Sequence, residues 1–540
     1  MTGHYSDVWQ ALARALPERP AIVTRDRTLS YAQFAHEAGA LAEHLTRSGV
    51  RAGDSVAILM YNRPEYLVAL FACLATGIAP VPINFRYRAG EVADLLEDSE
   101  AVVLITTTSC TEVAEAAIGL VAERTGESPA LIQARDEGAA AGTALDFAGI
   151  VDVPGQLPAT PPPGGEVRLY TGGTTGRPRA VVWAAEDILD VQMYSIYGPI
   201  GLAYPDTIDD VVRIAADPAT PRTATLPLAP FMHGTALFSS MNTLVLGGTV
   251  VIHDAARLDA AEAIRLAVDE RATRLIVAGD AVALPILEAA EAAGLSSLGD
   301  VASVISSGMR FSVTTKERLH GLGRIVITDL LASTEGGPYA VNVTTSVADL
   351  PGRLRLLPGA VVLDEDLIDV QHQPGRRGIL AFRGRLPKGY FRDEEKTRAT
   401  FPVIDGVRHV MPGDWAEVLD DGCVDLLGRG SAVVNTGGEK VYPAEVEQAL
   451  LSHPAVRDAV VFGIPDPRFG EVVAAVVVLL PGADATTGQV RAHVDERLAG
   501  YKKPRHIFER PSLERSPHGK IDMPALTAGV LDELRTAAAR

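Results

Sequence analysis

Two hydrophobic periodicities alternate along most of the chain. Short runs rich in β-branched residues predict strands, and the stretches between them carry apolar positions at helical spacing. The predicted strands include residues 55–60, 101–106, 249–253, 275–278, 301–306 and 325–328. The predicted helices include residues 31–48, 260–270, 281–293 and 314–322. This alternation predicts an α/β fold of layered subdomains with mainly parallel sheets.

The pattern changes in the C-terminal third of the chain. After about residue 350 the predicted strands shorten, at residues 379–384, 415–419 and 424–427, and Asp420-Asp421-Gly422 signals a turn. These features predict an antiparallel β module. From Val441 onward the sequence predicts a small α+β domain, with helices at residues 443–452 and 487–498 and strands at residues 459–463, 472–480 and 506–509.

Two segments contain residues that interrupt regular structure. The sequence PGQLPATPPPGG at residues 154–165 cannot form a helix or a central strand, so it predicts a linker or surface loop before a strand at residues 167–170. The longest apolar run, residues 67–83, contains Gly77, Pro80 and Pro82. It therefore predicts a buried helix, a turn and a strand, and we expect no membrane anchor.

The composition and charge exclude some classes of binding partner. The 540 residues include 68 acidic and 49 basic side chains, a formal charge of −19 with a pI near 5.1, which argues against nonspecific binding to nucleic acid or anionic membranes. Cys73, Cys110 and Cys423 form no Cys-x-x-Cys pair, and the N-terminus has no basic stretch followed by an apolar core. These features predict no disulfide framework, structural zinc site or secretory signal, so we expect a cytoplasmic location.

A glycine-rich turn follows the strand predicted at residues 167–170. Its sequence, TGGTTGRPR at residues 171–179, combines three glycines with three threonines and two arginines. Backbone N–H groups and hydroxyls in such a turn can bind a phosphate, because glycine permits positive φ and close approach, although a solvent loop is the alternative. Neither the Walker A spacing nor the Gly-x-Gly-x-x-Gly dinucleotide spacing fits this turn.

The turn resembles the phosphate-binding loop of the adenylate-forming enzymes, the superfamily of acyl-CoA synthetases, firefly luciferases and nonribosomal-peptide adenylation domains. Further segments that are similar to the family's motifs follow in the family's order and span essentially the whole chain. They are PLAPFMHGTAL at 227–237, SSGM at 306–309, STEGG at 333–337, PGDW at 412–415, GRGSAVVNTGGEKVYPAEVE at 428–447, GIPDPRFGE at 463–471, YKKPR at 501–505 and SPHGKID at 516–522.

The resemblance implies a domain organisation, a reaction and its cofactors. A large N-terminal domain, residues 1–428, is expected to bind ATP and the acid substrate, and a small mobile C-terminal domain, residues 429–540, to carry a catalytic lysine. The substrate carboxylate attacks the α-phosphate of ATP in the presence of Mg²⁺, which gives an acyl adenylate and pyrophosphate. The acyl group then passes to CoA. Positioning and charge neutralisation supply most of the catalysis at phosphorus.

Each candidate residue takes its role from the matching family motif. Lys520 is expected to reach the α-phosphate and the substrate carboxylate, and Glu335 to bind Mg²⁺. His233 is expected to gate the acyl pocket or orient the carboxylate, with a buried core histidine as the alternative. Asp414 is expected to bind the ribose hydroxyls, and the loop at residues 437–439 to face the pantetheine of CoA. The residues expected to contact the nucleotide are Thr171, Gly172, Gly173, Thr174, Thr175, Gly176, Arg179, Ser307, Gly308, Met309, Ser333, Thr334, Asp414 and Arg429.

Several positions depart from the family pattern. Arg179 stands where the family has lysine, which changes the reach of the cation. Leu331 and Ala332 stand where an adenine-stacking aromatic residue is usual, and Ser431 replaces Asp or Lys at the interdomain hinge. The stretch that begins at Gly428 is nevertheless similar to a subgroup of fatty-acid and sterol-side-chain acyl-CoA ligases.

Three functions remain open at this point. The first is an acyl- or aryl-CoA ligase. The second is an adenylation without CoA transfer, such as that of the diazotases of secondary metabolism, which adenylate nitrite and pass it to an arylamine. The third is a catalytically silent nucleotide-binding homologue, which the joint presence of Glu335, Asp414 and Lys520 disfavours.

Overall fold

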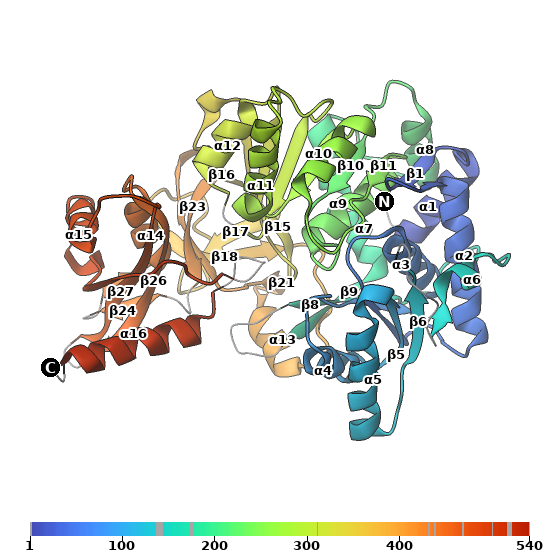
Figure 1. Cartoon of the computed structure of the whole chain (residues 1–540), viewed down its shortest axis with the longest axis horizontal. Coiled ribbons are helices and arrows are strands. Elements are labelled where there is room, and N and C mark those ends of the chain that lie inside the picture. The colour runs from blue at the N-terminus through green and yellow to red at the C-terminus, as the bar shows by residue number, and fades with distance from the viewer. Residues whose placement is uncertain are drawn as a thin grey trace. The chain divides into compact units, whose positions relative to one another are not determined.

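A computed structural model describes most of the chain (Figure 1). The described residues are 3–136, 144–171, 178–309, 311–429, 433–436, 439–466, 469–498, 500–515 and 521–538. The chain forms two compact units. Unit 1 contains Met1–Pro338, Asn342–Gly352 and Gly384–Pro402, and unit 2 contains Tyr339–Val341, Arg353–Arg383 and Val403–Arg540. The domain boundary predicted at residues 428 and 429 falls within unit 2 and stays a prediction.

The first sheet of unit 1 is parallel, with the strand order β4-β3-β5-β6-β7. Its strands are β3 (Ser55–Leu59), β4 (Ala79–Pro82), β5 (Ala101–Thr107), β6 (Ala130–Ala134) and β7 (Leu145–Asp146). The helices of this region are α2 (Tyr31–Arg47), α3 (Pro64–Thr76), α4 (Ala89–Ser99), α5 (Thr111–Thr125) and α6 (Phe147–Val151). The longest apolar run is confirmed as a buried helix, a turn and a strand, because α3 ends at Gly77 with a φ of 70° and β4 follows.

The second sheet of unit 1 runs in the order β2-β1-β11-β10-β12-β13-β14. Its strands are β1 (Pro20–Val23), β2 (Thr28–Ser30), β10 (Ala224–Pro227), β11 (Thr249–Val251), β12 (Arg274–Val277), β13 (Ser303–Ser307) and β14 (Val326–Ser333). All pairs in this order are parallel except that of β1 with β2. The helices are α1 (Tyr5–Ala15), α7 (Ala185–Tyr197), α8 (Ile208–Ala216), α9 (Gly234–Val245), α10 (Ala260–Asp269), α11 (Gly279–Ala292) and α12 (Val313–His320).

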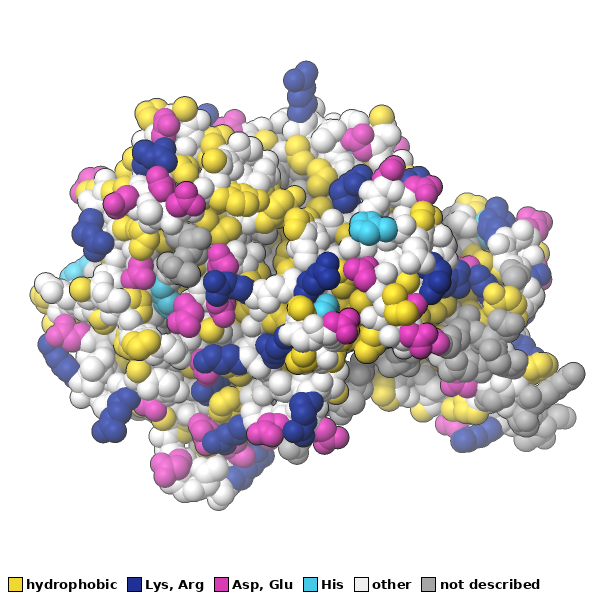
Figure 2. Space-filling view, turned by 180° about the vertical axis from the view of Figure 1, so that it is seen from behind, with side chains coloured by type: hydrophobic (Ala, Val, Ile, Leu, Met, Phe, Trp, Pro, Cys, Tyr) yellow, Lys and Arg dark blue, Asp and Glu magenta, His cyan; other side chains and the backbone are white. Residues whose placement is uncertain are grey.

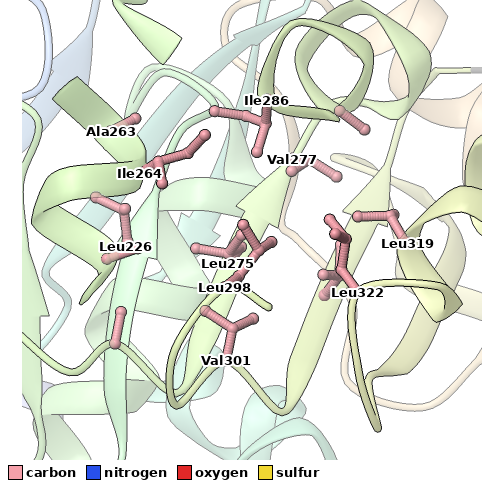
Figure 3. Packing of buried hydrophobic residues seen from close by; sticks show 14 of the residues in the cluster. Leu226, Ala263, Ile264, Leu275, Val277, Ile286, Leu298, Val301, Leu319 and Leu322 are labelled. Carbon is pink, nitrogen blue, oxygen red and sulfur yellow. The ribbon is translucent and has the colours of Figure 1, made fainter. Parts of the chain in front are cut away.

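Helices α10, α11 and α12 bury one face of this second sheet. Figure 3 shows Leu226, Leu275 and Val277 of the strands facing Ile264 of α10 and Ile286 of α11. Parallel strands covered by helices carry continuous apolar runs rather than alternating ones. This packing holds the carboxyl ends of the strands in fixed positions, and the predicted α/β architecture is confirmed.

A three-stranded antiparallel sheet completes unit 1. Its order is β19-β9-β8, with β8 (Glu166–Thr171), β9 (Arg179–Ala184) and β19 (Gly389–Tyr390). Strand β19 and helix α13 (Glu394–Thr400) belong to the segment Gly384–Pro402, which is far from β8 and β9 in the sequence. The glycine-rich turn therefore begins at the end of β8, as the sequence predicts, and β9 follows it in the sequence.

The loop before β8 packs closely on unit 1. Residues 154–165 form neither a helix nor a strand, as predicted. Gly155 lies so near α2 that an added Cβ atom would be 2.3 Å from the Cα atom of Ala40. Only glycine fits at this contact, since real Cβ atoms do not approach backbone so closely.

Unit 2 contains the predicted antiparallel module. Its strand order is β16-β23-β22-β18-β21-β20, and β17 pairs with β18. The strands are β16 (Leu354–Leu356), β17 (Ala360–Leu363), β18 (Arg377–Arg383), β20 (Val403–Ile404), β21 (Val407–Val410), β22 (Asp414–Val418) and β23 (Cys423–Arg429). Strand β15 (Gly337–Thr344) contributes Ala340 and Val341, which pair with β16.

The C-terminal part of unit 2 is an α+β layer with helices on both faces of a sheet (Figure 1). The strands are β24 (Val434–Thr436), β25 (Glu439–Val441), β26 (Val456–Asp466), β27 (Gly470–Leu479) and β28 (His506–Glu509). Successive side chains of β26 point to opposite faces of the sheet. Val461 packs with helices α14 (Pro443–Leu451) and α15 (Thr487–Asp495) on one face. Val460 and Phe462 pack with α16 (Met523–Ala538) on the other face.

The surface carries charges of both signs. Figure 2 shows acidic and basic side chains interspersed over the described part of one face. Among the described residues, no helix combines the length and the apolar composition that crossing a membrane requires.

Candidate active site

Glu335 follows β14 and is the best-defined residue of the predicted site. The hydroxyl of Tyr390 donates a hydrogen bond to Glu335 Oε1 at 2.9 Å, and Thr171 Oγ1 lies 3.5 Å from the same oxygen. The indole N–H of Trp183 donates to the carbonyl oxygen of Thr334 at 2.9 Å. Strands β8, β9, β14 and β19 therefore converge on one half-buried carboxylate beside the start of the glycine-rich turn.

Arg179 stands at the other end of that turn and is bound by an acidic residue. Its Nη1 atom lies 2.8 Å from Asp393 Oδ2, while the side chain of Asp393 also caps α13 by accepting from the N–H of Lys396. The Arg179 side chain is 42% exposed, so the ion pair with Asp393 does not bury it.

The predicted SSGM segment lies at the carboxyl end of β13. Ser306 and Ser307 pair in register with Asp329 and Leu330 of β14, and the Ser306 hydroxyl accepts a hydrogen bond from the N–H of Gly279 at 2.9 Å. Gly308 has a φ of 78°, which L side chains rarely adopt, so this position favours glycine. Ligands of open α/β sheets bind outside the carboxyl ends of parallel strands, where these residues lie.

The loop that leads to His233 is fixed by a buried amide. Asn62 Nδ2 donates to the carbonyl oxygens of Pro227 and Ala229 at 3.0 and 2.9 Å, and Asn62 Oδ1 accepts from the N–H of Phe231 at 2.7 Å. His233 is the N-cap residue of α9 and its side chain is exposed. The alternative of a buried core histidine is therefore wrong.

Asp414 lies in unit 2, at the start of β22. It pairs in register with Arg429 of β23, so two predicted nucleotide contacts occupy opposite positions on neighbouring strands. The predicted site residues that lie outside the described residues are Gly172, Gly173, Thr174, Thr175, Gly176 and Lys520, together with Gly437 and Gly438 of the predicted CoA loop.

The surroundings of Glu335 fit a magnesium ion that is held mainly by nucleotide phosphates. Among the described residues no group of three or more His, Cys, Asp or Glu side chains could hold a metal. Mg²⁺ is usually bound through one or two carboxylates plus substrate phosphates rather than by an all-protein cage. A single carboxylate next to a phosphate-binding turn is such a donor set.

The comparisons with known proteins decide the family. The sequence pattern of the AMP-binding enzymes matches residues 9–391, and that of the AMP-binding enzyme C-terminal domain matches residues 445–520. The chain belongs to the AMP-binding enzyme family.

Relatives of this AMP-binding enzyme match it along nearly its whole length. The medium-chain acyl-CoA ligase Mig of Mycobacterium avium is 38% identical over 547 residues, covering 95% of this chain and 96% of the relative. The medium/long-chain-fatty-acid–CoA/3-oxocholest-4-en-26-oate–CoA ligase of Mycolicibacterium smegmatis is 36% identical over 540 residues, covering 97% and 95%. The solved structure of a Mycobacterium tuberculosis fatty acyl CoA synthetase superposes with a TM-score of 0.70 at 25% identity, covering 97% and 98%.

This AMP-binding enzyme is an ATP-dependent ligase of the acid–CoA type. It adenylates an organic acid, releases pyrophosphate and transfers the acyl group to CoA, and Mg²⁺ is general for the family. The relatives reported above give no support to nitrite as the acid.

Three side chains around the site of this AMP-binding enzyme were missed by the sequence reasoning. Tyr390 and Trp183 contact the segment that holds Glu335, and Asn62 holds the loop before His233. The sequence offers one signal for Tyr390, the stretch KGYFRDEEK at residues 388–396, which places an aromatic residue among charges. Trp183 and Asn62 act through contacts with residues more than a hundred positions away, which no local pattern indicates.

Proposed function

We propose that the acid substrate is a medium- to long-chain aliphatic carboxylate, of the fatty-acid or sterol-side-chain type. The proposal is carried by the identity of 36–38% over at least 95% of this chain to ligases whose names give such acids. The motif at 227–237 carries the exposed His233 among apolar residues such as Phe231 and Leu237, a composition in keeping with an aliphatic acid.

We further propose that the residues act as their motifs imply. Glu335 binds Mg²⁺, the turn that begins at Thr171 binds the β- and γ-phosphates, and Asp414 binds the ribose. The hydroxyl of Thr171 near Glu335 Oε1 supports this assignment, since it brings the phosphate turn and the metal ligand together. His233 orients the substrate carboxylate at the mouth of the acyl pocket. The adenine pocket is lined by Ser306, Ser307, Gly308 and Met309.

The C-terminal residues complete this proposal. Residues 429–540 act as a lid that delivers Lys520 for adenylation and presents the loop at residues 437–439 to CoA. Arg429 contacts the nucleotide at the beginning of this lid. We also propose a cytoplasmic location, where ATP and CoA are supplied.

A panel of acids tests the substrate class. Pyrophosphate release is measured with ATP and Mg²⁺ for saturated acids of 8 to 16 carbons, a steroid side-chain carboxylate, benzoate and nitrite, each with and without CoA. The aliphatic acids are expected to give the highest kcat/KM and a CoA thioester. Preferential turnover of benzoate or of nitrite with an arylamine would overturn the proposed substrate class.

The role of Lys520 gives a second prediction. Lys520→Ala is expected to slow adenylate formation by about 10²–10³-fold, because the positive charge that offsets the charge developing at phosphorus is lost. Thioester formation from synthetic acyl-AMP and CoA is expected to change little. Arg497→Ala is the control, because it removes a cation, 44% exposed, that also belongs to residues 429–540. The rates of both steps are expected to stay unchanged in this variant. Equal slowing of both steps by Lys520→Ala contradicts its assignment.

A further inference from the structure

We propose that Tyr390 is a positioning residue that orients the Glu335 carboxylate towards the magnesium–nucleotide complex. The inference rests on the proposed function of Glu335 as the metal ligand. It gives a function to the segment Gly384–Pro402. This segment belongs to unit 1, although the residues on both sides of it in the sequence belong to unit 2.

The hydrogen bond itself restricts the carboxylate. The Tyr390 hydroxyl donates to Glu335 Oε1 at 2.9 Å, which occupies one lone pair of that oxygen and restricts rotation of the carboxylate. The Thr171 hydroxyl lies 3.5 Å from the same oxygen, so both hydroxyls lie on the Oε1 side of the carboxylate and a cation is expected at Oε2. Groups that hydrogen-bond a metal-ligating carboxylate set its orientation, and their loss typically lowers metal affinity 10- to 100-fold.

The ring of Tyr390 is itself held in place. Tyr390 pairs with Val181 of β9 through the backbone, and its own N–H donates to Thr397 Oγ1 at 2.8 Å. Phe401 packs against the ring with centroids 6.0 Å apart. The ammonium group of Lys396 lies 4.8 Å from the ring centroid and favours a polarised O–H group that donates to a carboxylate.

The surrounding segment is tied to the same strands by ion pairs. Asp393 binds Arg179 at the end of the glycine-rich turn at 2.8 Å, and Lys388 Nζ lies 2.8 Å from Glu166 Oε1 at the start of β8. The guanidinium of Arg168 on β8 lies 3.9 Å from the ring centroid of Phe391. These contacts tie the segment that carries Tyr390 to β8 and to the C-terminal end of the turn, so the Tyr390 hydroxyl has a defined position relative to Glu335.

Metal binding tests the proposal without relying on turnover. Mn²⁺ is titrated into the full chain with a non-hydrolysable ATP analogue, and free Mn²⁺ is measured by electron paramagnetic resonance. Tyr390→Phe is expected to raise the Kd for Mn²⁺ by about tenfold. In turnover assays the Mg²⁺ concentration for half-saturation is expected to rise by a similar factor, while the KM for the acid stays unchanged.

The matched control is Tyr170→Phe. Tyr170 lies next to Thr171, but its hydroxyl donates to Asp98 Oδ2 at 2.6 Å instead of to Glu335, so its Mn²⁺ affinity is expected to equal that of the wild type. If Tyr390→Phe does not fold, Lys396→Met keeps the hydroxyl and removes the cation beside it, and a smaller rise in the same Kd is expected.

The outcomes separate this inference from the proposed function. Wild-type protein that binds no Mn²⁺ with the nucleotide overturns the role of Glu335. Normal Mn²⁺ binding by the wild type, with the same Kd in Tyr390→Phe, overturns only the positioning role of Tyr390. An equal rise in both tyrosine variants also overturns it, because it shows a general loosening of the sheet.

Discussion

At the residue scale, the carboxyl edge of the second sheet depends on a buried ion pair. Lys316 Nζ of α12 donates to Asp329 Oδ2 at 2.7 Å with the lysine side chain only 4% exposed. Burial raises the pKa of Asp329, and the ammonium group of Lys316 opposes that rise. Because Asp329 pairs in register with Ser306, the pair fixes the strand ends that carry the predicted adenine contacts.

Removal of one partner of this pair is expected to be costly. Lys316→Met should lower the free energy of unfolding by about 3–5 kcal/mol, since Asp329 is left as an uncompensated buried charge. The double variant Lys316→Met with Asp329→Leu is expected to recover most of that loss. Urea unfolding monitored by circular dichroism measures both effects.

Arg318→Met is the control on the same helix. Arg318 pairs with Glu291, which is 57% exposed, so its loss is expected to cost under about 1 kcal/mol. If Lys316→Met lowers the free energy of unfolding by as little as Arg318→Met does, the buried ion pair does not stabilise the fold as predicted.

At the scale of elements, the link between β3 and α3 fixes the loop between β10 and α9. Asn62 makes three hydrogen bonds to that loop and is 8% exposed. Its substitution by alanine leaves two carbonyl groups and one N–H group without their partner, and each buried group left unsatisfied costs about 1–3 kcal/mol. The loop carries His233, so its order also bears on the acid site.

Asn62→Ala is therefore expected to lower the free energy of unfolding by about 3 kcal/mol or more and to raise the KM for the acid. Asn84→Ala is the control. Asn84 accepts a hydrogen bond at 3.0 Å from the exposed N–H of Arg86 and also hydrogen-bonds the side chain of Tyr87, so its loss removes contacts near the surface and is expected to cost less than the loss of Asn62. Differential scanning calorimetry and steady-state kinetics measure the two effects. An unchanged melting temperature and KM in Asn62→Ala would show that the loop is held by other contacts.

The elements themselves were largely predictable, for a physical reason. Strands β3, β5 and β13 and helices α2 and α10 have apolar patterns that depend only on which side chains face the core. Helix α16 was not predicted, although its apolar residues pack on β26 and β27. Element boundaries agreed to within a few residues, because capping and fraying depend on local contacts beyond the periodic pattern.

The site could be predicted only as far as its motifs extend. Glu335, Thr171 and Ser307 were placed by resemblance, and the geometry brings Glu335 and Thr171 together. Tyr390 and Trp183 could not be found in this way, because their roles arise from the pairing of β19 with β9 and from contacts across the chain. The roles assigned to the residues outside the described ranges, including Lys520, stay predictions.

At the scale of the whole molecule, buried charges join the two parallel sheets of unit 1. Arg63 precedes α3 and lies 2.8 Å from Asp136, after β6 of the first sheet, and 3.5 Å from Asp254, after β11 of the second. Its Nε atom also lies 3.0 Å from Glu65. Burial raises the pKa of Asp254 to about 6, with Glu65, Asp136 and Asp26 adding to the rise and Arg63 opposing it.

The raised pKa of Asp254 predicts a pH dependence of stability. Between about pH 4 and 6 the folded chain keeps the Asp254 proton that the unfolded chain releases, so this group's contribution to stability falls as the pH rises. Asp254→Asn does not titrate, and its stability relative to the wild type is expected to rise by up to about 3 kcal/mol across that window. Urea midpoints of both proteins between pH 4 and 7.5 measure this. A pH-independent difference contradicts the prediction.

The central claim, that the acid is activated as an acyl adenylate before transfer to CoA, is tested most directly by oxygen tracing. Dodecanoate labelled with ¹⁸O in both carboxylate oxygens is converted in the presence of ATP, Mg²⁺ and CoA, and the nucleotide product is examined by mass spectrometry. Attack of the carboxylate on the α-phosphate predicts AMP that carries one ¹⁸O for each acyl-CoA formed. Unlabelled AMP, or ADP as the nucleotide product, would contradict the account.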